Sequence, residues 1–456
     1  LDAAKPIFLN GIPRESDEKH RITCYWLYAV CSFCWRRQYY FPPYIGLQAG
    51  ENLWSAAGGF LATGVGLSVL ALVAMARNNG SLAELTRPAG KTLGLLLTVV
   101  CYLALGPLFG TPRTATVAYE TGIHPVTSGR FPLSAFSALF FLTVILCSLN
   151  PLRLVEILGK FLSPMKVIAL GLLGLYAFLK PGGDEVVTSA DYLTQPLSRG
   201  LINGYLTMDT LAALVFSIIV VNAIRGRGIS EHAEITKYTV AAALIAGAGL
   251  VYVYISLFYL GVFSHALAPA AANGAEVLQA YISATFGYRG GIVLAFIITV
   301  ACLVTAIGLT SACAAFFSSL TGLSYRLNVV VMAVVSAVFS NMGLTEIIRF
   351  SLPALTSIYP PFIVLVFAGA LLPANGRPSV IFLPTIVTAL TFGIVQSVIP
   401  DASMPRFIKV IPLYEQEMVW LLPACSVFMV MAVTSKFCFK TSVNCEKDVR
   451  FWHKAD

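Results

Sequence analysis

LINGYLTMDTLAALVFSIIVVNAI, residues 201–224, is the stretch that decides the fold. It is long enough to cross a bilayer, yet Asn203, Thr207, Asp209 and Thr210 interrupt its first half. A carboxylate at the centre of a membrane helix costs about 2.5–3.5 kcal/mol on insertion scales, so Asp209 must face the protein interior or lie near the interface. The stretch predicts a membrane span that unwinds near Asp209 and holds a substrate or cation there. The alternative is that Asp209 caps a helix or pairs with an arginine such as Arg113.

The remaining chain has the composition of a membrane protein. Of its 456 residues, 57% are hydrophobic and only 11% are charged, and the mean hydropathy is +0.79. A soluble protein carries about 25% charged residues, so this chain has too few charges to cover a water-facing surface. We therefore attribute the net charge of +8 to loops that set membrane topology, not to nucleic-acid binding.

Apolar runs of bilayer length recur along the sequence. In lipid each run must be a helix, because every backbone polar group needs a partner within the protein. We predict an all-α polytopic membrane protein with about twelve spans, at residues 22–45, 53–76, 92–118, 131–149, 159–179, 201–224, 238–263, 291–317, 327–342, 349–372, 379–399 and 418–437. The run at 327–342 is short and is a candidate for a partly re-entrant segment.

The loop charges predict an orientation. If the N-terminus is cytoplasmic, alternating loops place about two thirds of the 30 lysine and arginine residues on the cytoplasmic side, as the positive-inside rule requires. We expect one transmembrane domain at 22–437, with cytoplasmic tails at 1–21 and 438–456.

Prolines mark two places where helices should deform. Pro107 and Pro112 lie in GPLFGTPRTATVAYE (106–120) and predict a kink or break. Arg113 follows them and is expected either to pair with Glu120 or Asp209 or to extend toward the membrane surface. In FSLPALTSIYPPF (350–362), three prolines should bend or end the helix, as a gate or as a plain structural kink.

Adjacent hydroxyls in FIITVACLVTAIGLTSACAAFF (296–317) suggest a cation site. Thr310 and Ser311 follow Ile307 by one helical turn, and sodium prefers several hard oxygen ligands. Alternatively, such hydroxyls bond back to the carbonyl four residues earlier or join helices.

Catalysis is disfavoured. The five histidines lie in predicted loops or tails, and the sequence has neither an HExxH nor a Gly-x-Ser-x-Gly motif. Asp209 is the one plausible intramembrane aspartate, whereas intramembrane enzymes need a pair of catalytic groups or a metal cluster. We expect no enzyme activity.

From residue 41 onward the chain resembles the bacterial branched-chain amino acid carriers, the cation symporters for leucine, isoleucine and valine. The resemblance rests on FPPYIGLQAGENLWSAAGGF (41–60), VCYLALGPLFGTPRTATVAYE (100–120), NGYLTMDTLAALVF (203–216), ACLVTAIGLTSACAAFF (301–317) and SIYPPF (357–362). The stretches around GPLFGTPRTATVAYE and NGYLTMDTL are specific to that family.

The resemblance implies a leucine-transporter-type fold, a five-plus-five inverted repeat with two added spans, in the bacterial cytoplasmic membrane with both termini inside. It implies import of branched-chain amino acids with sodium as coupling ion, or a proton instead, and no other cofactor. The implied substrate residues are Tyr205, Thr207, Met208, Asp209 and Thr210, and the implied sodium ligands are Ile307, Thr310 and Ser311. The implied gating or structural residues are Pro42, Pro43, Pro107, Pro112, Arg113, Pro360 and Pro361.

One segment departs from the family pattern. Family members carry a Gly-Ala-Gly-Asn-type stretch directly before Phe-Pro-Pro, whereas this chain reads CSFCWRRQYYFPP at 31–43. Arginines and bulky aromatic residues cannot unwind a helix as glycines do. Back-translated as TGG CGC CGG CAA TAT TAT TTT, residues 35–41 give Gly-Ala-Gly-Asn-Ile-Ile when read one base later. We therefore hypothesise that residues 24–40 are a wrong-frame segment, and the alternative to a working carrier is a transport-defective family member.

Overall fold

The computed structural model describes residues 41–127, 129–149, 168, 171–179, 186–225, 228–229, 231–372, 379–400 and 403–434. Every regular element in these ranges is a helix, which confirms the expected all-α class. The departing segment 24–40, both predicted tails and most of the predicted span at 159–179 lie outside the described residues.

Long apolar helices fill the described chain. Seven stretches have the length and composition to cross a membrane: Phe41–Arg77, Lys91–Thr127, Pro196–Ile218, His232–Val262, Gly274–Thr321, Leu344–Leu371 and Ser379–Val398. Shorter apolar helices span Leu133–Leu149, Tyr325–Ser340 and Leu421–Thr434. They coincide with predicted apolar runs, while the count of twelve spans stays a prediction. The run expected at 327–342 forms one uninterrupted helix, so it does not reverse as a re-entrant segment would.

The first stretch contains two differently directed pieces. Its elements are α2 (Phe41–Ala49), η1 (Gly50–Asn52), α3 (Leu53–Leu61), the π-helical η2 (Ala62–Gly66) and α4 (Leu67–Arg77), followed by α5 (Leu82–Thr86) and η3 (Arg87–Ala89). Gly50 has φ +47°, a left-handed conformation that ends the helix before it. Pro42 and Pro43 lie buried in α2.

The second stretch is kinked where its prolines predict. It comprises α6 (Lys91–Leu103), η4 (Ala104–Leu108), α7 (Gly110–Val117), η5 (Ala118–Ile123) and α8 (His124–Thr127), and α9 (Leu133–Leu149) follows. Gly106, directly before Pro107, has a non-helical ψ of −114°. Proline removes a backbone donor and clashes with the preceding turn, so the expected kink is confirmed.

The span predicted at residues 201–224 is interrupted. After α11 (Ala190–Thr194), α12 (Pro196–Tyr205) ends, and α13 (Asp209–Arg225) begins after three intervening residues. We call α12, residues 206–208 and α13 together the broken span. α14 (His232–Val262) then runs without interruption.

The helices after α14 differ from the prediction at the prolines of α17. They are α15 (Gly274–Thr321), α16 (Tyr325–Ser340), α17 (Leu344–Leu371), α18 (Ser379–Val398) and α19 (Arg406–Lys409). α15 is interrupted at Gly287, which has φ +63°, so its long second part forms the span expected at 291–317. α17 continues through Pro353, Pro360 and Pro361 to Leu371. The expectation that these prolines end the helix is therefore wrong.

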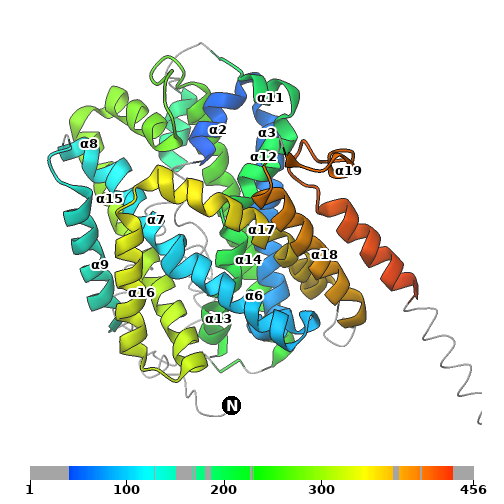
Figure 1. Cartoon of the computed structure of the whole chain (residues 1–456). Helices are drawn as coiled ribbons and strands as arrows, with labels where there is room; N and C mark the ends of the chain where they lie inside the picture. The colour runs from blue at the N-terminus through cyan, green and yellow to red at the C-terminus, as the bar shows by residue number, and fades with distance from the viewer. Residues whose placement is uncertain are drawn as a thin grey trace, which may run out of the picture.

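Close helix packing gives the fold its centre. A Cβ on Gly46 of α2 would collide with the carbonyl oxygen of Phe258, and one on Gly261 of α14 would collide with that of Pro43. Glycines allow backbones of membrane helices to approach this closely. α12 lies in the upper half of Figure 1 and α13 in the lower half, with α9 and α16 at one flank and α18 at the other.

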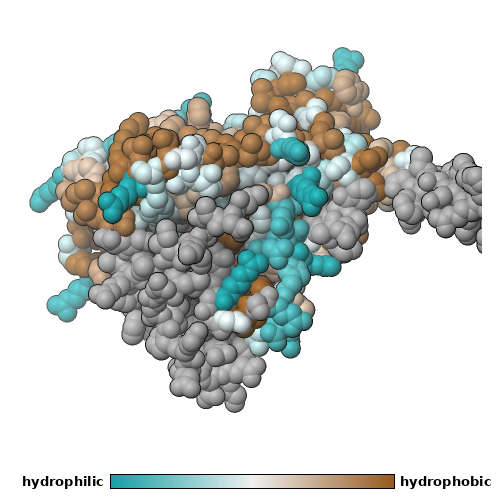
Figure 2. Space-filling view, turned by 90° about the horizontal axis from the view of Figure 1, so that it is seen from below, coloured by the Kyte–Doolittle hydropathy of each residue, from teal (hydrophilic) through white to brown (hydrophobic). Residues whose placement is uncertain are grey.

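The outer surface matches a membrane environment. Seen from below, Figure 2 shows apolar residues along the flanks and hydrophilic residues gathered on the face turned to the viewer. Large apolar side chains such as Leu139, Leu146 and Val338 are 57–66% exposed. Exposed apolar surface of this extent is expected where lipid replaces water.

Candidate functional site

The break in the broken span is built from local hydrogen bonds. Thr207 donates through its backbone amide to the carbonyl of Gly204 at 3.3 Å and through its hydroxyl to the same carbonyl at 2.7 Å. Met208 then adopts φ +55°, a left-handed conformation that is rare for residues other than glycine. The chain leaves α12 and restarts as α13 at Asp209, as the polar residues predicted.

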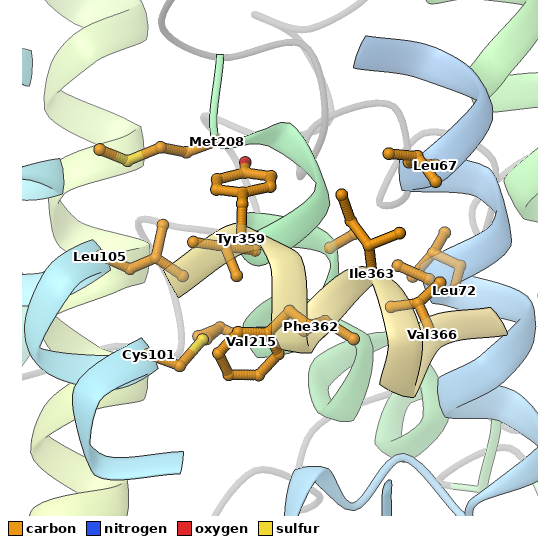
Figure 3. Packing of buried hydrophobic residues seen from close by; sticks show 14 of the residues in the cluster. Leu67, Leu72, Cys101, Leu105, Met208, Val215, Tyr359, Phe362, Ile363 and Val366 are labelled. Carbon is orange, nitrogen blue, oxygen red and sulfur yellow. The ribbon is translucent and has the colours of Figure 1, made fainter. Parts of the chain in front are cut away.

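A non-glycine residue in this conformation costs on the order of 1–3 kcal/mol and is concentrated at functional sites. Met208 is 2% exposed, so its side chain is held by packing. Met208, Tyr359 of α17 and Leu105 of η4 belong to one cluster of buried side chains (Figure 3). Apolar side chains from three elements therefore meet at the break.

Asp209 is the charged residue at the break. It is 9% exposed, and its Oδ2 accepts a hydrogen bond of 2.6 Å from the hydroxyl of Tyr254 on α14. As the first residue of α13, it also lies at the positive end of a helix dipole. These two features stabilise a carboxylate inside the bundle.

The next residue joins the break to α4. The hydroxyl oxygens of Thr210 and Ser68 are 3.5 Å apart, and Ser68 donates to the carbonyl of Gly64 in η2 at 2.6 Å. π-helical turns are frequent at functional sites. Thr207, Met208, Asp209 and Thr210 follow one another at the break, and their role in substrate binding stays a prediction. Tyr205 ends α12 directly before them.

The sequence does not identify two residues that contact the break. Tyr254 and Ser68 both lie in long apolar helices, α14 and α4, where tyrosine and serine are unremarkable. Only the three-dimensional packing pairs them with Asp209 and Thr210.

The predicted cation residues share one turn of α15. Thr310 is 1% exposed and Ile307 is fully buried. Within the part of the chain that the structure describes, the hydroxyl oxygens of Thr310 and Ser311 are buried and make no hydrogen bond. The alternative that they bond back along their own helix is therefore wrong for these two residues.

Other hydroxyls in the bundle behave differently. Thr305, one turn earlier in α15, donates to the carbonyl of Ala301 at 3.1 Å. Among the described residues, four more buried hydroxyls lack a partner: Thr111, Thr121, Ser148 and Thr299. Thr310 and Ser311 differ from these because they are adjacent and follow the carbonyl of Ile307 by one turn. An orphaned buried hydroxyl is costly, and this donor set suits a hard cation such as sodium.

Ser311 has one neighbour. The Tyr325 hydroxyl lies within hydrogen-bonding range of the Ser311 hydroxyl, although the hydrogen bond of 3.0 Å that it donates goes to the carbonyl of Ser148. Thr310 is thus the better isolated of the two oxygen atoms.

The helices that carry the two candidate sites pack against each other. A Cβ on Gly308 of α15 would lie 3.1 Å from the ring of Phe216 on α13, so these helices pack directly. Across α15, the Cys313 thiol donates to the carbonyl of Tyr102 at 3.3 Å. The candidate cation turn therefore lies between the lower half of the broken span and the helix that leads to the Gly106 kink.

The predicted gating residues are all buried in helices. Pro107 lies in η4 and Pro112 in α7, while Pro360 and Pro361 lie in α17. Arg113 is 4% exposed and donates to the hydroxyl of Ser351 at 3.1 Å. It is held inside the bundle, so the expectation that it extends to the membrane surface is wrong.

Glu120 makes a different contact from the one proposed for it. Its Oε1 accepts a hydrogen bond of 3.0 Å from the backbone amide of Leu344, the first residue of α17. A carboxylate at a helix N-terminus satisfies an otherwise free amide. Glu120 therefore fastens η5 to the start of α17.

Solved structures define the class of protein. The chain is similar to the inward-facing conformation of Mhp1, with a TM-score of 0.58, 13% identity and 91% of each chain covered. It is also similar to MhsT in complex with L-phenylalanine, with a TM-score of 0.51, 14% identity, and 93% of this chain and 99% of that chain covered. At this identity the likeness concerns the fold alone, which is that of polytopic membrane transporters.

Sequence comparison gives the family. The model of the branched-chain amino acid transport protein family matches residues 38–438, so the chain belongs to that family. It is 47% identical over 397 residues to the branched-chain amino acid permease BrnQ of Escherichia coli strain K12, covering 86% of this chain and 90% of the relative. It is likewise 47% identical over 389 residues to the branched-chain amino acid transport system 3 carrier protein of Pseudomonas aeruginosa, covering 84% and 89%. The chain is thus a transport protein and not an enzyme.

Proposed function

We propose that this protein imports leucine, isoleucine and valine across the bacterial cytoplasmic membrane, coupled to sodium, with both termini in the cytoplasm. The observation that carries the proposal is the break at residues 206–208, where Met208 has φ +55° within a family of branched-chain amino acid transport proteins. Broken helices of this kind hold substrates and ions in secondary transporters.

The substrate would lie against the break. The N-terminus of α13 offers unsatisfied amides and a positive dipole end to the substrate carboxylate. The buried side chains of Leu105, Met208 and Tyr359 meet beside it (Figure 3) and suit an aliphatic substrate side chain. Such apolar sites distinguish one methylene by only about 1–3 kcal/mol, so overlapping uptake of the three amino acids is expected.

Sodium would bind at the turn in α15. The carbonyl of Ile307 and the hydroxyls of Thr310 and Ser311 would supply part of its oxygen shell, which explains why two buried hydroxyls make no hydrogen bond within the described chain. Coupling to a proton is the alternative, and it predicts uptake that follows a pH gradient without sodium.

The test is uptake of labelled leucine into proteoliposomes that hold the purified full chain. A sodium gradient should drive accumulation, and excess unlabelled isoleucine or valine should compete with it. Absence of leucine uptake under sodium and pH gradients, both from this chain and from the folded variant described next, would contradict the proposal.

The atypical segment calls for a second chain in the same assay. The family match begins at residue 38, next to Trp35, Arg36 and Arg37. If residues 24–40 are a wrong-frame segment, a variant carrying Gly-Ala-Gly-Asn-Ile-Ile at 35–40 and the matching shifted residues upstream transports leucine, and the printed chain does not. If both transport equally, the proposed lesion at 24–40 is wrong. DNA sequencing across codons 20–45 gives an independent test of the frame.

A further inference from the structure

A short, buried hydrogen bond joins Tyr254 of α14 to Asp209 at the start of α13. The Tyr254 hydroxyl donates to the Asp209 carboxylate at 2.6 Å, and the two residues are 1% and 9% exposed. A hydrogen bond to a carboxylate is stronger than one between neutral groups, and burial removes competing water. The bond therefore fixes where the carboxylate lies.

The donor itself is firmly held. The Tyr254 ring packs edge-on against Phe60 of α3, with ring centroids 5.1 Å apart, and Phe60 packs in the same way against Phe258 at 5.3 Å. Phe60 and Phe258 are 0% and 1% exposed. Tyr254 thus presents its hydroxyl from an aromatic cluster that joins α3 to α14.

The acceptor controls the broken span. Asp209 is the first residue of α13 and directly follows Met208, whose φ of +55° must be maintained by surrounding contacts. Anchoring the Asp209 side chain holds the start of α13 in the direction that this backbone conformation gives it. The aromatic cluster is therefore linked to the break through one hydroxyl group.

We propose that Tyr254 is a positioning residue for substrate binding: it acts through Asp209 to hold the start of α13 in its binding conformation and does not itself touch the substrate. The inference rests on the proposed function, because it assumes that leucine binds at residues 207–210. It assigns a role to a helix, α14, that contributes no residue to the predicted site.

The test compares the leucine affinity of the purified full chain with that of single-residue variants. If only the variant of residues 24–40 transports, all substitutions are made in that variant. Tyr254→Phe removes the hydroxyl and keeps the ring, so it should raise the dissociation constant of labelled leucine about tenfold, measured on protein that still elutes as a folded species. Tyr281→Phe is the matched control: Tyr281 is also 1% exposed but lies in the first part of α15, and its replacement should leave leucine affinity unchanged.

Asp209→Asn distinguishes positioning from packing. If Tyr254 acts through the Asp209 charge, adding Tyr254→Phe to Asp209→Asn should weaken binding by less than about threefold further, the coupling expected of residues in contact. A full tenfold loss in that background would overturn the proposal, as would unchanged affinity in Tyr254→Phe alone or a loss matched by Tyr281→Phe. If the unaltered protein binds and transports no leucine, the proposed function fails first, and that outcome is separately visible.

Discussion

The broken span and α15 differ in backbone continuity and in the hydrogen bonding of their polar side chains. In the broken span the backbone is interrupted, and the polar side chains around the break find protein partners: Thr207 bonds to Gly204, and Asp209 to Tyr254. In α15 the helix runs unbroken past Ile307, yet the hydroxyls of Thr310 and Ser311 make no hydrogen bond within the described chain.

This difference indicates which kind of ligand each region can bind. An amino acid needs main-chain amides and carbonyls, which a continuous helix hides in its own hydrogen bonds. A cation needs a few oxygen atoms, which side chains on an intact helix can offer at the cost of leaving them unsatisfied. The broken span therefore suits the substrate, and α15 suits the ion.

The largest effect should come from separating the broken span from α3. A Cβ on Gly59 would collide with the carbonyl oxygen of Leu197 in α12, whereas one on the adjacent Gly58 would meet nothing. Gly59→Ala should cost about 3 kcal/mol or more, because backbone must move, and should nearly abolish folded protein. Size-exclusion profiles of solubilised protein measure this, with Gly58→Ala as the control, and equal yields would contradict the packing.

Removing the charge at the break should rank next. Asp209→Asn keeps the side-chain size but removes the charged acceptor of Tyr254, and hydrogen bonds to charged groups contribute about 1.5–3 kcal/mol. We expect leucine uptake to fall about 10- to 100-fold per folded molecule. Asp191→Asn removes an exposed partner of Arg199 at 3.5 Å and should change uptake by less than about twofold. Similar losses in both variants would refute a special role for Asp209.

A smaller effect should appear in substrate preference. Leu105 is fully buried beside Met208 (Figure 3), so Leu105→Ala should favour larger substrates and lower the ratio of valine to leucine uptake about 3- to 10-fold. Leu97→Ala, two turns earlier in α6, shortens another buried leucine and should leave the ratio unchanged. Competition assays measure both ratios, and an unchanged ratio in Leu105→Ala would place the substrate side chain elsewhere.

The smallest effect is expected at the outer charges of the broken span. Arg199 of α12 lies 3.9 Å from Glu417, and both side chains are more than a third exposed. Such pairs contribute about 0–1 kcal/mol, so Glu417→Gln should alter leucine uptake by less than about twofold. A much larger loss would mean that this pair, and not the break, controls the broken span.

The sequence anticipated features that arise from local chemistry. Polar residues around Asp209 within an apolar run predicted the break, and the glycine and proline at 106–107 predicted the kink, because both disturb a helix wherever it packs. The adjacent hydroxyls of Thr310 and Ser311 were likewise visible in the sequence, although their unsatisfied state depends on the fold.

Features that depend on contacts between distant helices could not be predicted from the sequence. α17 continues through Pro360, where Gly393 of α18 packs closely against the carbonyls of Thr356 and Ser357; neighbouring helices can compensate for proline in membrane spans. One partner of Arg113 is Ser351, 238 residues away. No spacing rule in one sequence identifies such contacts.

The most direct test of the account is the sodium dependence of leucine uptake in two threonine variants of α15. Thr310→Ala removes a hydroxyl that makes no hydrogen bond, whereas Thr305→Ala removes one bonded to Ala301. Uptake should need sodium, and Thr310→Ala should raise the half-saturating sodium concentration at least about tenfold, while Thr305→Ala leaves it within about twofold. Sodium-independent uptake, or equal shifts in both variants, would contradict a sodium site on this turn.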